Sequence, residues 1–203
     1  MRKKGQQDAQ QRKMAMPYVT SEMASIMRYV EREVKDPTLA QSLHFSPTAL
    51  ALVRRVMMSG GRVITDTTLA QHDVSAAMSR TLGIEVQCFI DDPQVVNLAM
   101  HKRITRAEIA LDHALMQSGM KLLVVGSAPM AIDRLLKRKQ AGPINDVVVL
   151  ATPSGFASVV QLKERLWESD IPCIVARGRK GGTAAAVALV NALMAESIKE
   201  QGL

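Results

Sequence analysis

The sequence lacks several features that define large classes of proteins. It has no unbroken apolar run of the about 18 residues that a membrane-spanning helix needs, so we expect no membrane association. The charged segment Met1–Gln7 has no apolar stretch after it, so it does not resemble a secretory signal. Only two cysteines occur, Cys88 and Cys173, far apart and without metal-ligand spacing. This usage is typical of a reducing compartment and predicts a cytoplasmic protein without disulfides.

Aromatic residues and common catalytic motifs are also scarce. Three Phe, two Tyr and one Trp are too few to stack bases as single-stranded nucleic-acid binders do, so nucleic acid is not an expected partner. No two of the four histidines have the spacing of a helical zinc site, and we expect no metal. Neither a Gly-x-Ser-x-Gly elbow nor a Walker A motif is present, which leaves a hydrolase triad and a P-loop without support.

The charge of the chain is positive and unevenly distributed. Among 203 residues, 26 Lys and Arg against 19 Asp and Glu give a formal net charge of +7. Residues 1–13 are basic, rich in glutamine and without apolar periodicity, which predicts a polar arm over residues 1–17 before a single domain over residues 18–203. A second basic cluster, Arg177–Gly182, lies between two strongly patterned segments. A net positive charge favours binding of an acidic small molecule as much as binding of nucleic acid.

Five short apolar runs rich in β-branched residues alternate with segments of helical periodicity. They are Arg62–Thr65, Ile84–Ile90, Lys121–Val125, Val147–Ala151 and Pro172–Ala176. This alternation predicts a doubly wound α/β domain with a mainly parallel five-stranded sheet and helices on both faces. Amphipathic patterns over residues 18–34 and 47–58 predict a helical N-terminal part.

Three sequence signals predict where helices begin. Ser46 precedes a proline, which suggests a capping hydroxyl with Pro47 at the first helical position. Thr105 and Glu108 have the spacing of a capping box. Asp92, also before a proline, is interpreted as a helix cap rather than as half of a catalytic carboxylate pair with Asp91.

Ligand sites in doubly wound sheets lie beyond the carboxyl ends of the strands. The first strand is followed by Asp66, His72 and Ser75, the third by Gly126-Ser127, and the fifth by Arg177–Thr183. Two of these loops combine glycine with a helix N-terminus, where free N–H groups and the helix dipole favour an anion. The residues alone therefore predict an oxyanion or carboxylate site, and a purely structural glycine turn is the alternative.

Eight stretches, in their order and spacing, resemble the precorrin-8X methylmutase family of cobalamin biosynthesis over about residues 20–195. They are His44–Pro47, Gly60–Ser75, Glu85–Pro93, Ile104–Arg106, Val125–Pro129, Pro153–Phe156, Val175–Gly182 and Val190–Leu193. The resemblance implies a cofactor-free isomerase that moves a methyl group from C11 to C12 of precorrin-8 or cobalt-precorrin-8. It also implies a homodimer that binds this tetrapyrrole near the subunit interface.

The resemblance implies that the many carboxylates of such a substrate are bound by this chain. In related proteins the arginine of the Ile-Thr-Arg stretch contacts the ligand, and here it is Arg106. We expect the substrate-binding residues to be Asp66, Ser75, Arg106, Gly126, Ser127, Arg177, Gly178, Arg179, Lys180, Gly181 and Gly182.

The chain departs from its family at the position of the proton donor. The family places a histidine in a segment that resembles Ile-His-Ala-Thr-Gly-Asp-Pro, and alignment on Asp36-Pro37 puts Arg32 at that place. Arginine stays protonated at any working pH and cannot act as a general acid. Two hypotheses follow: a methylmutase that relies on binding and distortion alone or on another acid, with His72 or His44 as candidates, or a paralogue that binds a corrinoid without rearranging it.

Overall fold

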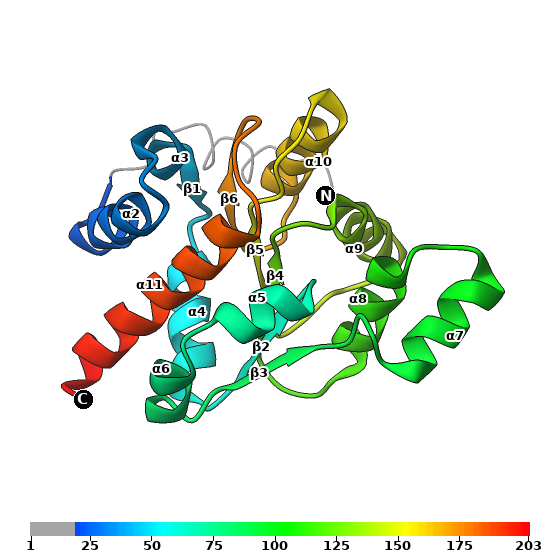
Figure 1. Ribbon diagram of the computed structural model, residues 1–203, viewed down its shortest axis with the longest axis horizontal. Coiled ribbons are helices and arrows are strands. Elements are labelled where there is room, and N and C mark those ends of the chain that lie inside the picture. The colour runs from blue at the N-terminus through cyan, green and yellow to red at the C-terminus, as the bar shows by residue number, and fades with distance from the viewer. Residues whose placement is uncertain (1–18) are drawn as a thin grey trace, which may run out of the picture.

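The computed structural model describes residues 19–203, and the predicted arm, residues 1–17, lies outside this range (Figure 1). Its centre is one six-stranded sheet in the order β1-β6-β5-β4-β2-β3. All neighbours in the sheet are parallel except β1, which runs antiparallel to β6. The strands are β1 (Leu43–Phe45), β2 (Arg62–Thr65), β3 (Glu85–Cys88), β4 (Lys121–Val125), β5 (Val147–Ala151) and β6 (Cys173–Ala176).

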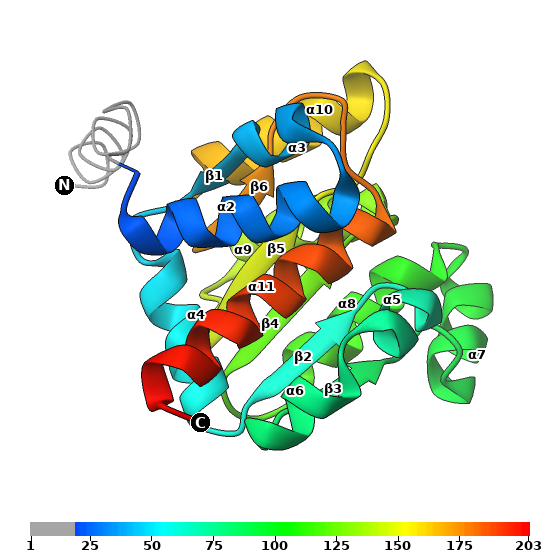
Figure 2. The ribbon, with the colours of Figure 1, turned by 60° about the vertical axis from the view of Figure 1, so that its left-hand side comes forward.

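Helices cover both faces of the sheet, as the alternating pattern predicted. One face carries α2 (Ser21–Val34), α3 (Pro37–Gln41), α4 (Ala49–Met58), α5 (Thr68–Asp73), α6 (Ala76–Thr81) and α11 (Thr183–Gln201). The other carries α8 (Arg106–Met116), α9 (Pro129–Ala141) and α10 (Ala157–Glu168), and α7 (Pro93–Lys102) packs on α8 at the periphery. Figure 2 shows α2 lying along α11. Within residues 19–203 no helix is long and apolar enough to cross a membrane.

Alternating residues of the central strands build two separate cores. Leu122 and Val124 of β4 point into the core beneath α2, α4 and α11, whereas Leu123 and Val125 point into the core beneath α8, α9 and α10. All five residues of β4 are buried. Strands covered on both sides are continuously apolar because neither face meets water. This explains why the buried strands stood out in the sequence.

The prediction of a mainly parallel α/β sheet is confirmed, but the predicted strand count was one too low. All five predicted runs contain a strand, and the sixth, β1, was missed. It has only three residues, and it pairs with β6 at the edge of the sheet through Leu43↔Ala176 and Phe45↔Ile174. So short a segment has no periodicity to detect. Its pairing depends on β6, about 130 residues later in the chain, which no local pattern reports.

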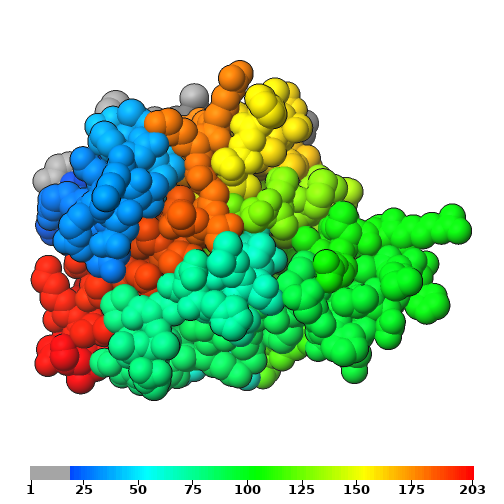
Figure 3. All heavy atoms as spheres, viewed as in Figure 1, coloured from blue at the N-terminus to red at the C-terminus, as the bar shows by residue number. Residues whose placement is uncertain are grey.

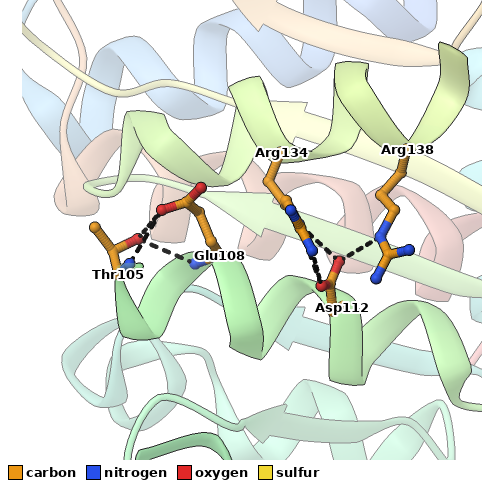
Figure 4. A network of polar contacts seen from close by, with 5 residues as sticks. All are labelled: Thr105, Glu108, Asp112, Arg134 and Arg138. Carbon is orange, nitrogen blue, oxygen red and sulfur yellow. Dashed lines mark hydrogen bonds and ion pairs between the residues drawn. The ribbon is translucent and has the colours of Figure 1, made fainter. Parts of the chain in front are cut away.

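Two of the three predicted helix starts are confirmed. Asp92 accepts hydrogen bonds from the N–H groups of Gln94 and Val95 at the start of α7. Figure 4 shows the capping box of α8, in which Thr105 and Glu108 bond reciprocally. The assignment of Ser46 was wrong: α4 begins at Ala49, and the Ser46 hydroxyl instead accepts the Cys173 N–H at 2.8 Å. The hydroxyl joins β6 to the chain after β1, a partner that is distant in sequence.

The connections bring four loops to one edge of the sheet. Strands β2, β4, β5 and β6 are parallel, so their carboxyl ends meet at the same edge. The chain moves outward from β2 to β3 in one direction and from β4 through β5 to β6 in the other. The direction therefore reverses between β2 and β4, and this switch point is where open α/β sheets bind ligands.

Candidate functional site

Asp66 occupies the switch point between β2 and β4. Its side chain accepts the backbone N–H groups of Ser127 and Ala128, each at 2.7 Å, and the residue is 8% exposed. These N–H groups precede α9, which has no other side-chain cap. The carboxylate therefore fills the anion position at this helix N-terminus, so these two N–H groups of the Gly126-Ser127 loop are satisfied within the chain.

We expect the Asp66 carboxylate to stabilise the fold measurably. Asp66→Ala should lower the free energy of unfolding by about 2–4 kcal/mol, because it leaves two backbone donors unpaired and removes a charged acceptor. Asp66→Asn keeps an acceptor of the same shape and should lose only about 1–2 kcal/mol. Urea unfolding of the two variants beside the wild type measures both values. Equal losses in the two variants would show that a neutral acceptor does not replace the carboxylate, whereas wild-type stability in Asp66→Asn would show that the charge contributes nothing.

The cationic loop, residues 177–182, joins β6 to α11 and lies between α3 and the start of α10 (Figures 1 and 3). Two of its three cations are already paired. Arg177 donates to both carboxylate oxygens of Glu164, at 2.9 and 3.0 Å. Lys180 donates to both oxygens of Asp36 and to the Thr38 hydroxyl. The bonds from Lys180 and Thr38 lower the pKa of Asp36 to about 2, so this pair is ionised across the physiological range.

Arg179, the third cation of this loop, differs from Arg177 and Lys180 in its side-chain contacts. It is exposed, and no described residue forms an ion pair or side-chain hydrogen bond with it. Its backbone is held, because the Arg179 carbonyl accepts the Gly155 N–H at 3.0 Å. A fixed backbone beneath a free guanidinium suits bidentate binding of a carboxylate from solution.

The glycines of the cationic loop permit a contact that no other residue could make. Gly181 has φ +149°, and a Cβ there would lie 1.9 Å from the carbonyl oxygen of Thr152. The next residue, Gly182, donates its N–H to the same oxygen at 2.6 Å. The loops after β5 and β6 are therefore locked together where a side chain would force them apart.

The N-terminus of α11 borders the same loops. No side chain caps this 19-residue helix, which begins after Gly182. Gly126 packs closely against it, and a Cβ at Gly126 would approach Ala186 Cβ to 2.9 Å and Thr183 Cα to 3.1 Å. The structure thus brings together Asp66, the Gly126-Ser127 loop and the cationic loop.

Ser75 and Arg106, two further predicted binding residues, are engaged locally. Arg106 forms an exposed ion pair with Asp91, with 2.7 Å between its Nη1 and the carboxylate oxygen. The Ser75 N–H donates to the side-chain oxygen of Asn191 on α11, and the Ser75 hydroxyl caps α6. An exposed surface pair contributes little to stability, so Asp91 leaves Arg106 able to exchange partners.

Arg32, the residue that the sequence resemblance predicts at the family's histidine position, lies on the exposed side of α2. Its side chain is 69% exposed, its Nε lies 3.4 Å from a carboxylate oxygen of Glu33, and its guanidinium covers the Tyr29 ring at 5.0 Å. It lines an open groove along α2 together with Ser25, Arg28, Tyr29 and Glu31. Four residues later Asp36, the N-cap of α3, accepts a hydrogen bond from Lys180, so the start of α3 is joined to the cationic loop, whereas no hydrogen bond or ion pair joins Arg32 to it among the described residues.

The two candidate histidines occupy different environments. His72 is exposed in the last turn of α5. His44 is half-buried in β1, where its Nδ1 lies 2.9 Å from the Ser42 carbonyl oxygen and its ring meets Trp167 edge-on. Among residues 19–203 no group of three or more His, Cys, Asp or Glu side chains could hold a metal ion.

Sequence reasoning missed the residues that support the cationic loop. They are Asp36, Lys163 and Glu164, which come from the N-cap of α3 and from α10. One signal was present: Lys163 lies at helical spacing from the buried Leu166 and Trp167, so it interrupts an apolar stripe. A lysine at such a core position is unusual and suggests a specific partner.

The fold and the site define a class: a doubly wound α/β protein with a cationic glycine loop at the switch-point edge of its sheet. The profile of the family described as precorrin-8X methylmutase matches residues 6–196. This chain therefore belongs to the precorrin-8X methylmutase family, a family of isomerases, as the sequence resemblance predicted. The match begins at residue 6, within the segment predicted to be an arm.

Individual relatives and solved structures agree with this assignment. A cobalt-precorrin-8 methylmutase of Salmonella typhimurium is 35% identical over 171 residues, covering 84% of this chain and 80% of the relative. One from Methanothermobacter thermautotrophicus is 32% identical and covers 87% and 82%. A precorrin-8X methylmutase structure from Thermus thermophilus matches with a TM-score of 0.80 at 25% identity, covering 100% and 98% of the two chains.

Proposed function

We propose that this protein is a methylmutase-type isomerase that moves a methyl group from C11 to C12 of precorrin-8X or cobalt-precorrin-8 in cobalamin biosynthesis. Its membership of the family over almost the whole chain carries this proposal. The site supports it, because a cationic loop at the strand ends suits a substrate with many carboxylates. Conversion of the substrate spectrum by the purified protein is the direct test.

The macrocycle would lie over the edge of the sheet rather than inside it. The cavity beside Asp66 has a volume of only about 30 Å³ and is lined mostly by aliphatic side chains of β2, β4 and α8. Ligand pockets hold about 300–1,000 Å³, so this cavity is far too small for a tetrapyrrole. The exposed Arg179 and Phe156, the latter 81% exposed, then remain available to a large flat ligand.

For Arg179→Ala we expect about a tenfold loss of affinity for a carboxylate-rich corrinoid, because a charge-assisted bond contributes about 1.5–3 kcal/mol. The residual binding should also respond less to added salt. Arg106→Ala should weaken binding as well, although Asp91 already competes for this guanidinium. Titration with cobyrinic acid, whose peripheral carboxylates are free, measures both effects. Cobinamide, whose side chains are amides, is the control ligand, and unchanged affinity in both variants would remove the two arginines from the site.

The alternative function is binding of a corrinoid without rearrangement. It depends on the prediction that Arg32 stands at the family's histidine position; the Arg32 side chain is exposed and lies beside Glu33. An active enzyme would then rely on binding and distortion alone or on another acid, for which His72 and His44 are the candidates. Both functions predict a coloured complex with a corrinoid, but only the isomerase changes the spectrum of a precorrin-8-type substrate.

We also propose a homodimer that works in the cytoplasm. Large apolar side chains are exposed at several places, among them Met100 at 74% and Met116 at 76%, and a partner subunit would cover such surface. Cys88 and Cys173 are not joined by a disulfide, which suits a reducing compartment. Sedimentation analysis of the purified chain tests the dimer.

A further inference from the structure

Lys163 of α10 is a fully buried lysine whose ammonium group has one hydrogen-bond acceptor among the described residues. Its Nζ donates to the backbone carbonyl of Lys180 at 3.2 Å, and its exposed fraction is 0%. An ammonium has three N–H donors, so the structure satisfies this group poorly. Burial lowers the pKa of Lys163 to about 8, and the neighbouring Glu164 acts in the opposite direction.

A buried charge of this kind does not benefit the stability of the fold. Removing an ammonium from water costs several kcal/mol, and a single neutral acceptor does not offset this. An apolar side chain of the same length would fill the space beneath the cationic loop without that penalty. The role of Lys163 therefore depends on its hydrogen-bond partner, the Lys180 carbonyl.

That partner belongs to the cationic loop, which α10 holds at two points. Glu164 pairs with the Arg177 side chain at the start of the loop, and Lys163 holds the Lys180 carbonyl near its end. Between these two points lies Arg179, whose guanidinium has no partner among residues 19–203. Gly181 and Gly182 come next in the chain. Gly181 lies against the Thr152 carbonyl oxygen, and the Gly182 N–H donates to that oxygen just before α11 begins.

We propose that Lys163 is a positioning residue for ligand binding: its ammonium fixes the Lys180 carbonyl so that Arg179 and the start of α11 face the ligand. This inference takes one thing from the proposed function, namely that the ligand carries many carboxylates. The shape of the loop is a property of the chain alone. Lys163 touches no ligand in this account and acts through the loop above it.

Lys163→Met separates positioning from a structural role, because methionine has a similar length and no charge. We expect its affinity for cobyrinic acid to fall by about tenfold or more, the loss that one hydrogen bond to a charged group represents. If the chain turns over, KM should rise while kcat stays unchanged, as for an interaction that binds ground state and transition state equally. The midpoint of urea unfolding should stay the same or increase.

Arg165→Met on the exposed side of the same helix is the matched control. It removes only the surface pair with Asp133 and should change neither affinity nor the exchange of loop amides. Amide hydrogen exchange of Gly155 and Gly182, whose N–H groups bond the Arg179 and Thr152 carbonyls, reports on the loop without any ligand, and we expect it to be faster in Lys163→Met. Unchanged exchange in Lys163→Met would overturn the proposal, as would reduced stability with unchanged affinity. Failure of the wild type to bind cobyrinic acid would count against the proposed function and leave the exchange experiment decisive for Lys163.

Discussion

Gly181→Ala is expected to reduce the affinity for cobyrinic acid by at least about 100-fold, the equivalent of two lost charge-assisted bonds. The new methyl group would lie 1.9 Å from the Thr152 carbonyl oxygen, a distance at which the backbone must move. The hydrogen bond from the Gly182 N–H to the same oxygen would then break. The loops after β5 and β6 would separate, and Arg179 would lose its fixed position. Titration of the folded variant measures the effect.

Gly83→Ala is the control for backbone strain alone. Gly83 also has a left-handed backbone, with φ +64°, but a Cβ there meets no atom within 4 Å. This variant should lose roughly 1–2 kcal/mol of stability and keep its affinity. Wild-type affinity in Gly181→Ala would mean that the contact between the two loops is not needed for binding.

Arg32→His is expected to increase turnover of a precorrin-8-type substrate by about 10²–10⁴-fold, the usual contribution of general acid catalysis. Arginine cannot release a proton at neutral pH, whereas histidine can hold and deliver one. If Arg32 stands at the position of the proton donor, the wild type should turn over more slowly than Arg32→His while it binds the ligand equally well. Single-turnover spectra of the two proteins at matched saturation provide the measurement.

Arg32→Ala completes this experiment. If the position contributes no proton, Arg32→Ala should resemble the wild type in turnover, whereas Arg32→His should exceed both. Robust wild-type turnover that survives Arg32→Ala would place the acid elsewhere, with His72 as the next candidate. No gain in Arg32→His would show that a histidine on the exposed side of α2 does not reach the reacting carbon.

The sequence by itself determined the class of fold, because buried parallel strands must be apolar throughout and helices must be periodic. Runs such as Lys121–Val125 and Val147–Ala151 therefore mark their own strands. Local rules also predicted the Asp92 cap and the capping box of α8, since both partners of each bond lie within three residues. The order of the strand-end motifs was sufficient to recognise the family.

The contacts of the predicted binding groups could be read only from the folded chain. Asp66, which is predicted to bind substrate, holds the N–H groups before α9 with its Oδ2, whereas its buried Oδ1 has no hydrogen-bond partner among the described residues. Two of the three cations of the loop are paired with Asp36 and Glu164, which leaves Arg179 unpaired among the described residues. Asp36 and Lys180 are 144 positions apart, and β1 and β6 are equally remote in sequence. Local patterns cannot report such pairs, because they form only when the whole sheet brings distant segments to one edge.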